Sequence, residues 1–320
     1  MGPRPAPGAA DRHTCEALMP GKSDLATLEN GQLRASVQPG LGAGLTRLDW
    51  WHRGAWEPLL RPLSGPASDP EQLACCLLMP WSNRLYGSSF TWRGRVFHVR
   101  PSRAGDRQPL HGDAWVSAWS VISQGSDEIV LEFDARQHRP LAYIGRVHYR
   151  LDASRLQVSL CIEHCGDEPM PYGMGLHPWF VRESDTQIQF NSKSRWEPQA
   201  EQPPSFEMPL HCGDRNHFGE PQRLPSGLID HAYAGWDGHA RIRWPSRGLA
   251  LEMRATDSSN HLVVYSPPQQ ATHGFVCLEP VTHRNGAHIA ADPLVQGLVE
   301  LRRGQHLELE VSLVVTSDLI

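Results

Sequence analysis

The chain has 320 residues, of which 40% are hydrophobic and 20% are charged, so it is long enough for one large β domain or two ordinary domains. Its formal net charge of −5 and its isoelectric point near 6.4 exclude a strongly basic surface of the kind that binds nucleic acid or anionic lipid. No apolar run approaches 18 residues, so no membrane-spanning helix is expected.

Residues 1–24 are rich in Pro, Gly and Ala and are predicted to form a flexible leader. This segment lacks the apolar stretch of a secretory signal peptide. The seven cysteines are an odd number without the spacing of a disulfide framework, so we expect reduced thiols in a cytoplasmic protein. No linker divides the remaining chain, and residues 25–320 are therefore predicted to form one domain, as a monomer or a homodimer.

Apolar and polar residues alternate with a period of two along much of this domain. Such alternation is typical of half-buried antiparallel strands. The clearest runs are residues 128–136, 155–164, 248–256 and 306–315. Helical periodicity is confined to residues 71–78 and part of 290–302, where a few helical turns are expected. The pattern predicts an all-β protein built as a large sandwich of antiparallel sheets.

Several polar residues in the first half of the domain are candidates for binding vicinal hydroxyl groups. Asn83 and Arg84 follow Pro80 and Trp81, and Asn both donates and accepts while Arg presents a fixed fork of donors. A hairpin passing through Gly87 and Gly94 is expected next. His111 precedes a glycine and is predicted to begin another strand. An ordinary surface ion pair is the competing interpretation for Arg84.

His177, in the sequence YGMGLHPWF, is the first candidate for acid–base chemistry. A residue before proline is restricted to extended backbone, so Pro178 predicts that His177 lies in a strand or at its end. Gly173 and Gly175 leave room beside it for another backbone or a ligand. Trp179 follows closely, and an indole offers a flat face that suits a sugar ring. A satisfied structural histidine is the competing interpretation.

Glu279, in the sequence FVCLEPVTH, is the second candidate. It ends an apolar run and also precedes a proline, Pro280, so it is predicted to have the same extended geometry. A histidine and a carboxylate held in this way can act as a general acid and a general base. A nearby carboxylate is expected to raise the pKa of the histidine. Asp230 is expected in a loop, where a turn or capping role is its default.

Taken in chain order, PWSNR, the glycine-containing passage after it, PLHG, GLHPWF, the aspartate at 230 and LEP resemble the motifs of the aldose 1-epimerases, the galactose-mutarotase-like family. The resemblance covers nearly the whole chain beyond the leader. It implies a galactose-mutarotase-like supersandwich and the interconversion of the α and β anomers of a free aldose, without a metal or another cofactor. By the same resemblance, Glu279 would be the base and His177 the acid. The implied sugar-binding residues are Asn83, Arg84, His111, Trp179 and Asp230.

The chain also departs from the galactose-type members of that family. They carry an Asn-His-Ser-Tyr-Phe run around the histidine, and a substrate-binding Gln where this chain has Val263. The sugar is therefore left open between neutral and phosphorylated or sulfonated aldoses.

Other classes of protein fit the sequence less well. A non-catalytic sugar-binding or regulatory sandwich remains the main alternative, because it would keep the tryptophans without needing both His177 and Glu279. A metal-dependent β enzyme is disfavoured because the chain has no His-x-His or HExxH motif. The glycine-rich residues 40–44 lack the spacing of a nucleotide-binding loop and are predicted to form a tight turn.

Overall fold

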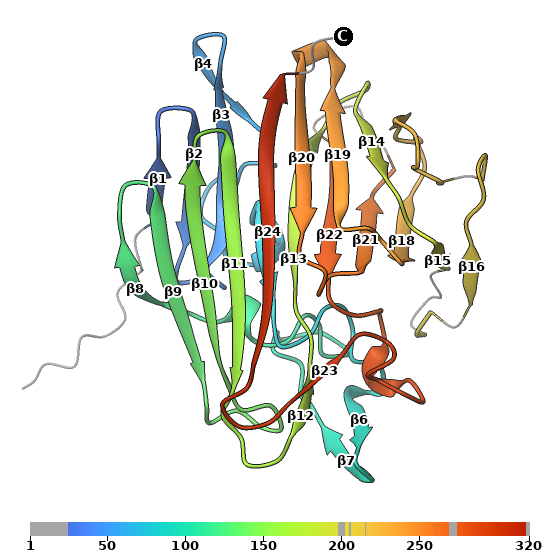
Figure 1. Ribbon diagram of the computed structural model, residues 1–320. Coiled ribbons are helices and arrows are strands. Elements are labelled where there is room, and N and C mark those ends of the chain that lie inside the picture. Colours follow the sequence, from blue (N-terminus) through green and yellow to red (C-terminus); the bar gives the residue numbers. More distant parts are fainter. Residues whose placement is uncertain (1–24, 198–201, 205, 215, 269–273, 318–320) are drawn as a thin grey trace, which may run out of the picture.

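Two large antiparallel sheets packed face to face make up most of the molecule (Figure 1). The computed structural model describes residues 25–197, 202–204, 206–214, 216–268 and 274–317. The leader predicted for residues 1–24 lies outside this part. The expected all-β sandwich of antiparallel sheets is confirmed.

The larger sheet carries the central strands that matter for the site. Within the described residues it has eleven strands, in the spatial order β1 (Ala26–Glu29), β2 (Leu33–Gln38), β3 (Gly44–His52), β5 (Cys75–Leu78), β13 (Gly175–Arg182), β22 (Gly274–Val281), β21 (His261–Ser266), β18 (Ile229–Ala234), β15 (Ser194–Trp196) and β16 (Glu207–Pro209), with β4 (Ala55–Pro58) paired to β3.

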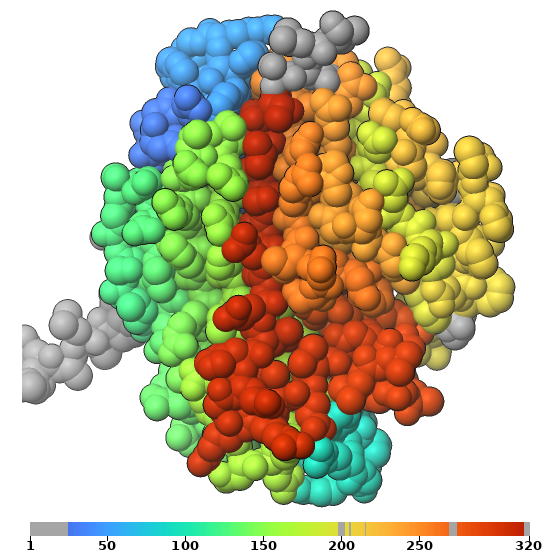
Figure 2. Space-filling view, viewed as in Figure 1, coloured from blue at the N-terminus to red at the C-terminus, as the bar shows by residue number. Residues whose placement is uncertain are grey.

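The second sheet has nine strands in the described part of the chain. Their order is β17 (Gln222–Arg223), β14 (Gln187–Phe190), β19 (His239–Trp244), β20 (Leu249–Ala255), β24 (His306–Ser317), β11 (Arg155–His164), β10 (Tyr143–Asp152), β9 (Glu128–Ala135) and β8 (Ser120–Gln124). The last strand, β24, therefore lies in the middle of this sheet, and Figure 2 shows it in red across the exposed face.

Shorter elements close one end of the sandwich. The hairpin expected around Gly94 is present as β6 (Ser89–Trp92) and β7 (Arg95–His98), and β12 (Met170–Tyr172) pairs with β23 (Val299–Leu301). Single 3₁₀ turns are η1 (Pro70–Gln72), η2 (Tyr86–Ser88), η3 (Ala114–Val116), η4 (Pro245–Arg247) and η5 (Ala287–Ile289). Among the described residues no helix is long and apolar enough to cross a membrane.

The period-two pattern predicted strands correctly, whereas the helical turns expected from helical periodicity at residues 71–78 and 290–302 are wrong. Strands β9, β11, β20 and β24 occupy the four alternating runs, and in β9 every second residue from Ile129 to Ala135 is buried. Residues 71–78 instead form η1 and the strand β5, whose four residues are all buried because it lies in the middle of a covered sheet. Residues 290–302 contain turns and β23, since Pro293 and the left-handed Gly297 interrupt a helix.

The turn predicted for residues 40–44 is present between β2 and β3. Gly42 has a φ of +62°, and a Cβ there would lie 2.1 Å from the carbonyl oxygen of Trp115. Glycine is therefore required both for the backbone conformation and for this close approach. The six described cysteines are free thiols, as expected.

Alternation along the central strands of the larger sheet separates a core face from a second face. On β13, Leu176 and Phe180 point into the core between the two sheets, where they meet residues of the nine-stranded sheet. Trp179 belongs to a separate cluster that contains no residue of the nine-stranded sheet, and Cys277 of β22 belongs to the same cluster. Side chains at alternating positions of β13 and β22 therefore lie on the outer face of the larger sheet.

Candidate active site

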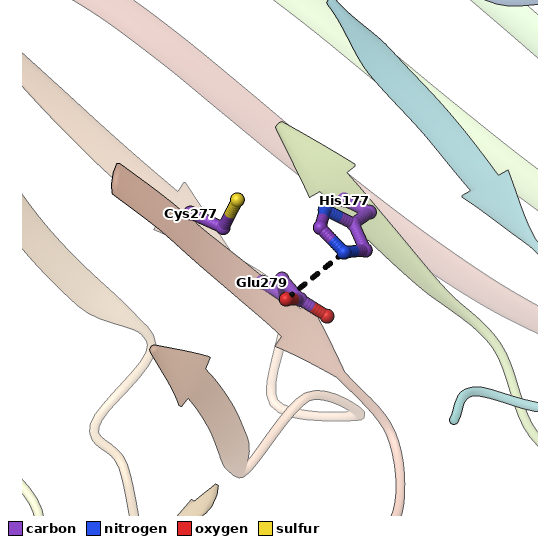
Figure 3. Close-up of side chains that lie close together, drawn as sticks. All are labelled: His177, Cys277 and Glu279. Carbon is purple, nitrogen blue, oxygen red and sulfur yellow. Dashed lines mark ion pairs between the residues drawn. The ribbon is translucent and has the colours of Figure 1, made fainter. Parts of the chain in front are cut away.

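His177 and Glu279 lie side by side on this outer face. His177 is on β13 and Glu279 is on β22, and the antiparallel register pairs Trp179 with Cys277. The imidazole therefore stands opposite the carboxyl group, and Nε2 of His177 is 3.2 Å from Oε1 of Glu279 (Figure 3). The predictions that both residues lie in extended strands and that they meet are confirmed.

Aromatic rings hold the imidazole of His177 in place. The indole of Trp179 stacks on it with ring centroids 3.9 Å apart, and the ring of His111 approaches edge-on at 5.6 Å. The His177 side chain is only 14% exposed, and its Nδ1 has no hydrogen-bond partner among the described residues. Packing therefore fixes the ring and directs Nε2 toward Glu279.

Burial controls the pKa values of the pair. Burial raises the pKa of Glu279 well above its usual range, and the negative charge of Asp230 adds to the effect. Burial also lowers the pKa of His177 to about 3, with a smaller contribution from the positive charge of Arg61. The pKa of His177 is therefore lowered and not raised as expected beside a carboxylate, because loss of hydration outweighs attraction. Burial therefore favours the neutral form of both groups, with the proton of the pair on the carboxyl group.

A cleft of about 350 Å³ opens above this pair. That volume lies at the small end of the range for small-molecule sites, about 300–1,000 Å³. All the side chains selected from the sequence line this one cleft: Asn83, Arg84, His111, His177, Trp179, Asp230 and Glu279.

Two loops that bind each other bring Asn83 and His111 to the cleft. The backbone N–H of Asn83 donates to Nδ1 of His111 at 3.0 Å, and the backbone N–H of His111 donates to the carbonyl oxygen of Asn83 at 3.0 Å. Both residues have left-handed backbone, with φ of 61° and 56°. The prediction that His111 begins a strand is wrong, because it lies in a loop between isolated bridges at Leu110 and Gly112.

The hydrogen bond to Nδ1 determines the tautomer of His111. Burial lowers the pKa of His111 well below its usual range, with the charge of His177 as the next cause, so the ring is neutral. A neutral imidazole that accepts at Nδ1 carries its proton on Nε2. His111 is therefore a hydrogen-bond donor at Nε2.

Arg84 is the exposed cation of the cleft. Its backbone N–H donates to Oδ1 of Asn83 at 2.8 Å, so this loop is stabilised by its own side chain. No ion pair holds the Arg84 guanidinium within the described residues. The amide nitrogen of Asn83 and the guanidinium of Arg84 are thus the donors that this loop offers to a ligand.

Asp230 lies on β18, so the prediction that it lies in a loop is wrong. The register pairs Asp230 with Tyr265 of β21, and it pairs Val263 of the same strand with Glu279. Burial raises the pKa of Asp230. Val263, where a glutamine was expected from the family, therefore places an apolar side chain beside the catalytic candidate Glu279.

Arg61 is the main residue of the cleft that sequence reasoning missed. Its guanidinium lies 5.0 Å from the centroid of Trp179 and 4.9 Å from that of Phe275. It also donates to the backbone carbonyl oxygens of Glu71 and Leu73, at 2.5 and 3.0 Å. The local sequence LLRPL carries no motif that would have selected it. The other lining residues not selected as site residues are Glu71, Cys76, Leu110, Trp115, Val263, Tyr265 and Phe275.

A second buried histidine anchors the loop that carries Asn83. The backbone N–H of Ser82 donates to Nε2 of His283 at 2.9 Å, and Nδ1 of His283 donates to the carbonyl oxygen of Arg284 at 2.8 Å. Gly173 makes room for this ring, since a Cβ at that position would lie 2.0 Å from Cδ2 of His283. The glycine four residues before His177 therefore serves the loop anchor.

The sequence matches the profile of the family described as aldose 1-epimerase over residues 24–313. The chain belongs to the aldose 1-epimerase family. Among curated family relatives, the uncharacterized protein YphB of Escherichia coli K12 is 32% identical over 298 residues, which cover 90% of this chain and 97% of that protein.

Solved structures agree with the family's fold. A crystal structure of a putative aldose 1-epimerase from Escherichia coli K12 is 28% identical, has a TM-score of 0.82, and covers 92% of this chain and 99% of that one. A galactose mutarotase-like protein from Clostridium acetobutylicum is 16% identical and has a TM-score of 0.78, with 91% of this chain and 94% of that chain covered. At this identity the similarity shows the fold alone. The predicted galactose-mutarotase-like supersandwich is confirmed.

Proposed function

We propose that this protein is an aldose 1-epimerase that interconverts the α and β anomers of a free aldose by opening and closing the pyranose ring. The observation that carries the proposal is the contact of 3.2 Å between His177 and Glu279 in a cleft lined by hydrogen-bonding groups. Membership of the aldose 1-epimerase family supports it.

The reaction needs two proton transfers and no redox step. Glu279 takes the proton of the C1 hydroxyl while His177 gives a proton to the ring oxygen, and the C1–O5 bond breaks to give the open-chain aldehyde. Rotation about C1–C2 and the reverse transfers close the ring with the other configuration at C1. A positioned acid or base typically contributes about 10²- to 10⁴-fold to such a step.

These roles require an ionised carboxylate and a protonated imidazole. Moving one proton from Glu279 to His177 creates that state without changing the net charge of the pair. Burial opposes the charged arrangement, and attraction between the two groups over 3.2 Å favours it. Hydrogen bonds donated by sugar hydroxyls to the Glu279 carboxylate further favour the charged arrangement.

The surrounding groups suit the remaining sugar hydroxyls. His111 donates from Nε2, Asn83 and Arg84 donate from their side chains, and Asp230 accepts when ionised. The indole of Trp179 stacks on the His177 imidazole and also contacts the Arg61 guanidinium. Trp179 therefore positions the proposed acid and lines the cleft.

Exchange spectroscopy on the two anomers tests the proposal directly. Freshly dissolved α-glucose, α-galactose and a set of neutral, phosphorylated and sulfonated aldoses are mixed with the protein, and anomer exchange is followed by NMR. At least one aldose should exchange faster than in buffer. Binding of a sugar without acceleration for any member of the set would instead identify a non-catalytic sugar-binding sandwich.

A further inference from the structure

We propose that His177 and Glu279, which line the cleft, also bind a thiophilic divalent cation, Zn²⁺ or Cd²⁺, together with the fully buried Cys277 beside them, and that the bound ion stops the epimerase reaction. One ligand atom from each residue lies within 4.8 Å of the other two (Figure 3). The inhibition rests on the proposed function, whereas the binding does not.

The two strands create this arrangement through their register. Cys277 precedes Glu279 by two residues on β22, so both side chains lie on the same face of the sheet. His177 stands opposite Glu279 on β13, and Figure 3 shows the three side chains converging above these strands. Central strands paired on both sides hold the ligands, so little ordering is needed when an ion binds.

The distances suit a small tetrahedral ion after a modest movement. Zn²⁺ binds sulfur at about 2.3 Å and nitrogen or oxygen at about 2.0–2.2 Å, so neighbouring ligand atoms end roughly 3.3–3.7 Å apart. His177 and Glu279 are already 3.2 Å apart. The Cys277 side chain has to close the rest of the gap, by about 1 Å.

Charge balance favours a divalent ion. A cation binds the thiolate form of Cys277 and the carboxylate form of Glu279, so two protons leave these groups when it binds. Binding M²⁺ releases these two protons to water and leaves one thiolate, one carboxylate and a neutral imidazole around the ion. The buried group with the ion bound is therefore neutral.

The chemistry of the three ligands selects the class of ion. Thiolate and imidazole together favour Zn²⁺ and Cd²⁺ over Mg²⁺ or Ca²⁺, which prefer oxygen ligands. An ion in this place occupies the carboxylate that accepts the sugar proton and the imidazole that donates one. His177 and Glu279 cannot then serve as an acid–base pair.

Cadmium titration of the full chain tests the site. Binding is followed by the thiolate–Cd²⁺ ultraviolet absorption, and anomer exchange is measured at each concentration relative to the metal-free rate of the same variant. Wild type is compared with Cys277→Ala and with Cys75→Ala, whose thiol is equally buried but belongs to the core between the sheets. Other thiols add a background, among them Cys161, which lies 3.7 Å from Nδ1 of His306.

We expect Cys277→Ala to lose the absorption of one thiolate–Cd²⁺ site and to need at least about tenfold more Cd²⁺ for half inhibition. Cys75→Ala should behave like wild type, and excess EDTA should restore the exchange rate. Affinity should rise with pH, because binding releases protons. Equal absorption and equal inhibition in wild type and Cys277→Ala would overturn the proposal.

The two proposals fail separately. If no aldose is epimerised, the thiolate–Cd²⁺ absorption still reports whether the site exists. If aldoses are epimerised but Cd²⁺ neither binds at Cys277 nor slows exchange, the metal site is wrong and the epimerase remains.

Discussion

At the scale of single residues, the cleft is governed by the loss of water around His177 and Glu279. Both side chains are buried, and burial favours the neutral form of each, whichever sign its charge carries. The two groups are also close enough to exchange a proton. Their titrations are therefore coupled, and burial favours the state with a protonated carboxyl group and a neutral imidazole.

Replacing either member of the pair should remove the reaction and leave the fold intact. We expect Glu279→Gln and His177→Asn each to lower kcat by about 10²-fold or more, because one proton transfer is lost. Anomer exchange by NMR measures kcat, and circular dichroism checks the fold. Near wild-type rates in both variants would mean that other residues carry the chemistry.

The same Glu279→Gln change should not destabilise the protein at neutral pH. The pKa of the carboxyl group is raised in the folded state, so as pH rises above about 4.5 the unfolded state loses its proton first and stability falls. The glutamine removes this effect, and its melting temperature should vary less with pH than that of wild type. A larger loss of stability in the variant as pH rises would contradict the raised pKa.

The pH dependence of kcat/KM follows from the two pKa shifts. Below about pH 3 His177 gains a proton while Glu279 keeps its own, so the base is lost. On the alkaline side, activity falls where Glu279 loses its proton, at a pH well above the usual carboxyl range. We therefore expect a bell-shaped profile whose acid limb lies near pH 3 and whose alkaline limb lies above the usual carboxyl range. An acid limb near pH 6.5 would show a histidine with an unshifted pKa.

At the scale of elements, the loop containing Asn83 and Arg84 brings these two side chains to the same cleft as His177 on β13 and Glu279 on β22. Arg84 offers a charged donor at the cleft. A hydrogen bond to a charged group is worth about 1.5–3 kcal/mol, so Arg84→Ala should raise KM roughly 10- to 100-fold and lower kcat by less. Arg93→Ala is the matched control, because that arginine pairs with Glu300 on the surface. An unchanged KM would make Arg84 structural.

The anchor between Ser82 and His283 should also control substrate affinity. His283→Leu leaves the buried N–H of Ser82 without an acceptor, which costs about 1–3 kcal/mol and loosens the loop. We expect KM to rise by about tenfold with a smaller change in kcat. His283→Gln, whose amide oxygen can take the place of Nε2, should restore most of the affinity. A loss of stability with unchanged KM would limit His283 to the fold.

At the scale of the whole molecule, the final strand completes the sheet that supports the site. Strand β24 lies between β11 and β20, and Leu309 on it is 1% exposed in the core between the sheets. Leu309→Ala should lower the free energy of unfolding by about 2–5 kcal/mol. Glu308→Ala, one residue away on the exposed side, should change it by less than about 0.5 kcal/mol. Denaturant unfolding measures both, and equal effects would contradict the assigned faces.

From its sequence alone, the class of fold was predictable, and His177 and Glu279 could be selected as the candidate acid and base. Period-two alternation marked the half-buried strands because side chains alternate across a sheet. The prolines after His177 and Glu279 marked extended backbone because proline excludes the α region for the residue before it. These signals are local, so they can be read from neighbouring residues.

The surroundings of His177 and Glu279 depend on the tertiary structure. Arg61 reaches the cleft through contacts with residues far along the chain, and Asp230 lies on a strand because its neighbour β21 pairs with it. Residues 75–78 are a buried strand because β3 and β13 pair with it on its two sides, although the composition of residues 71–78 also fits a helix. The pKa values of His177 and Glu279 depend on how much water is excluded. Solvent exclusion and strand pairing are properties of the folded chain, and no short stretch of sequence contains them.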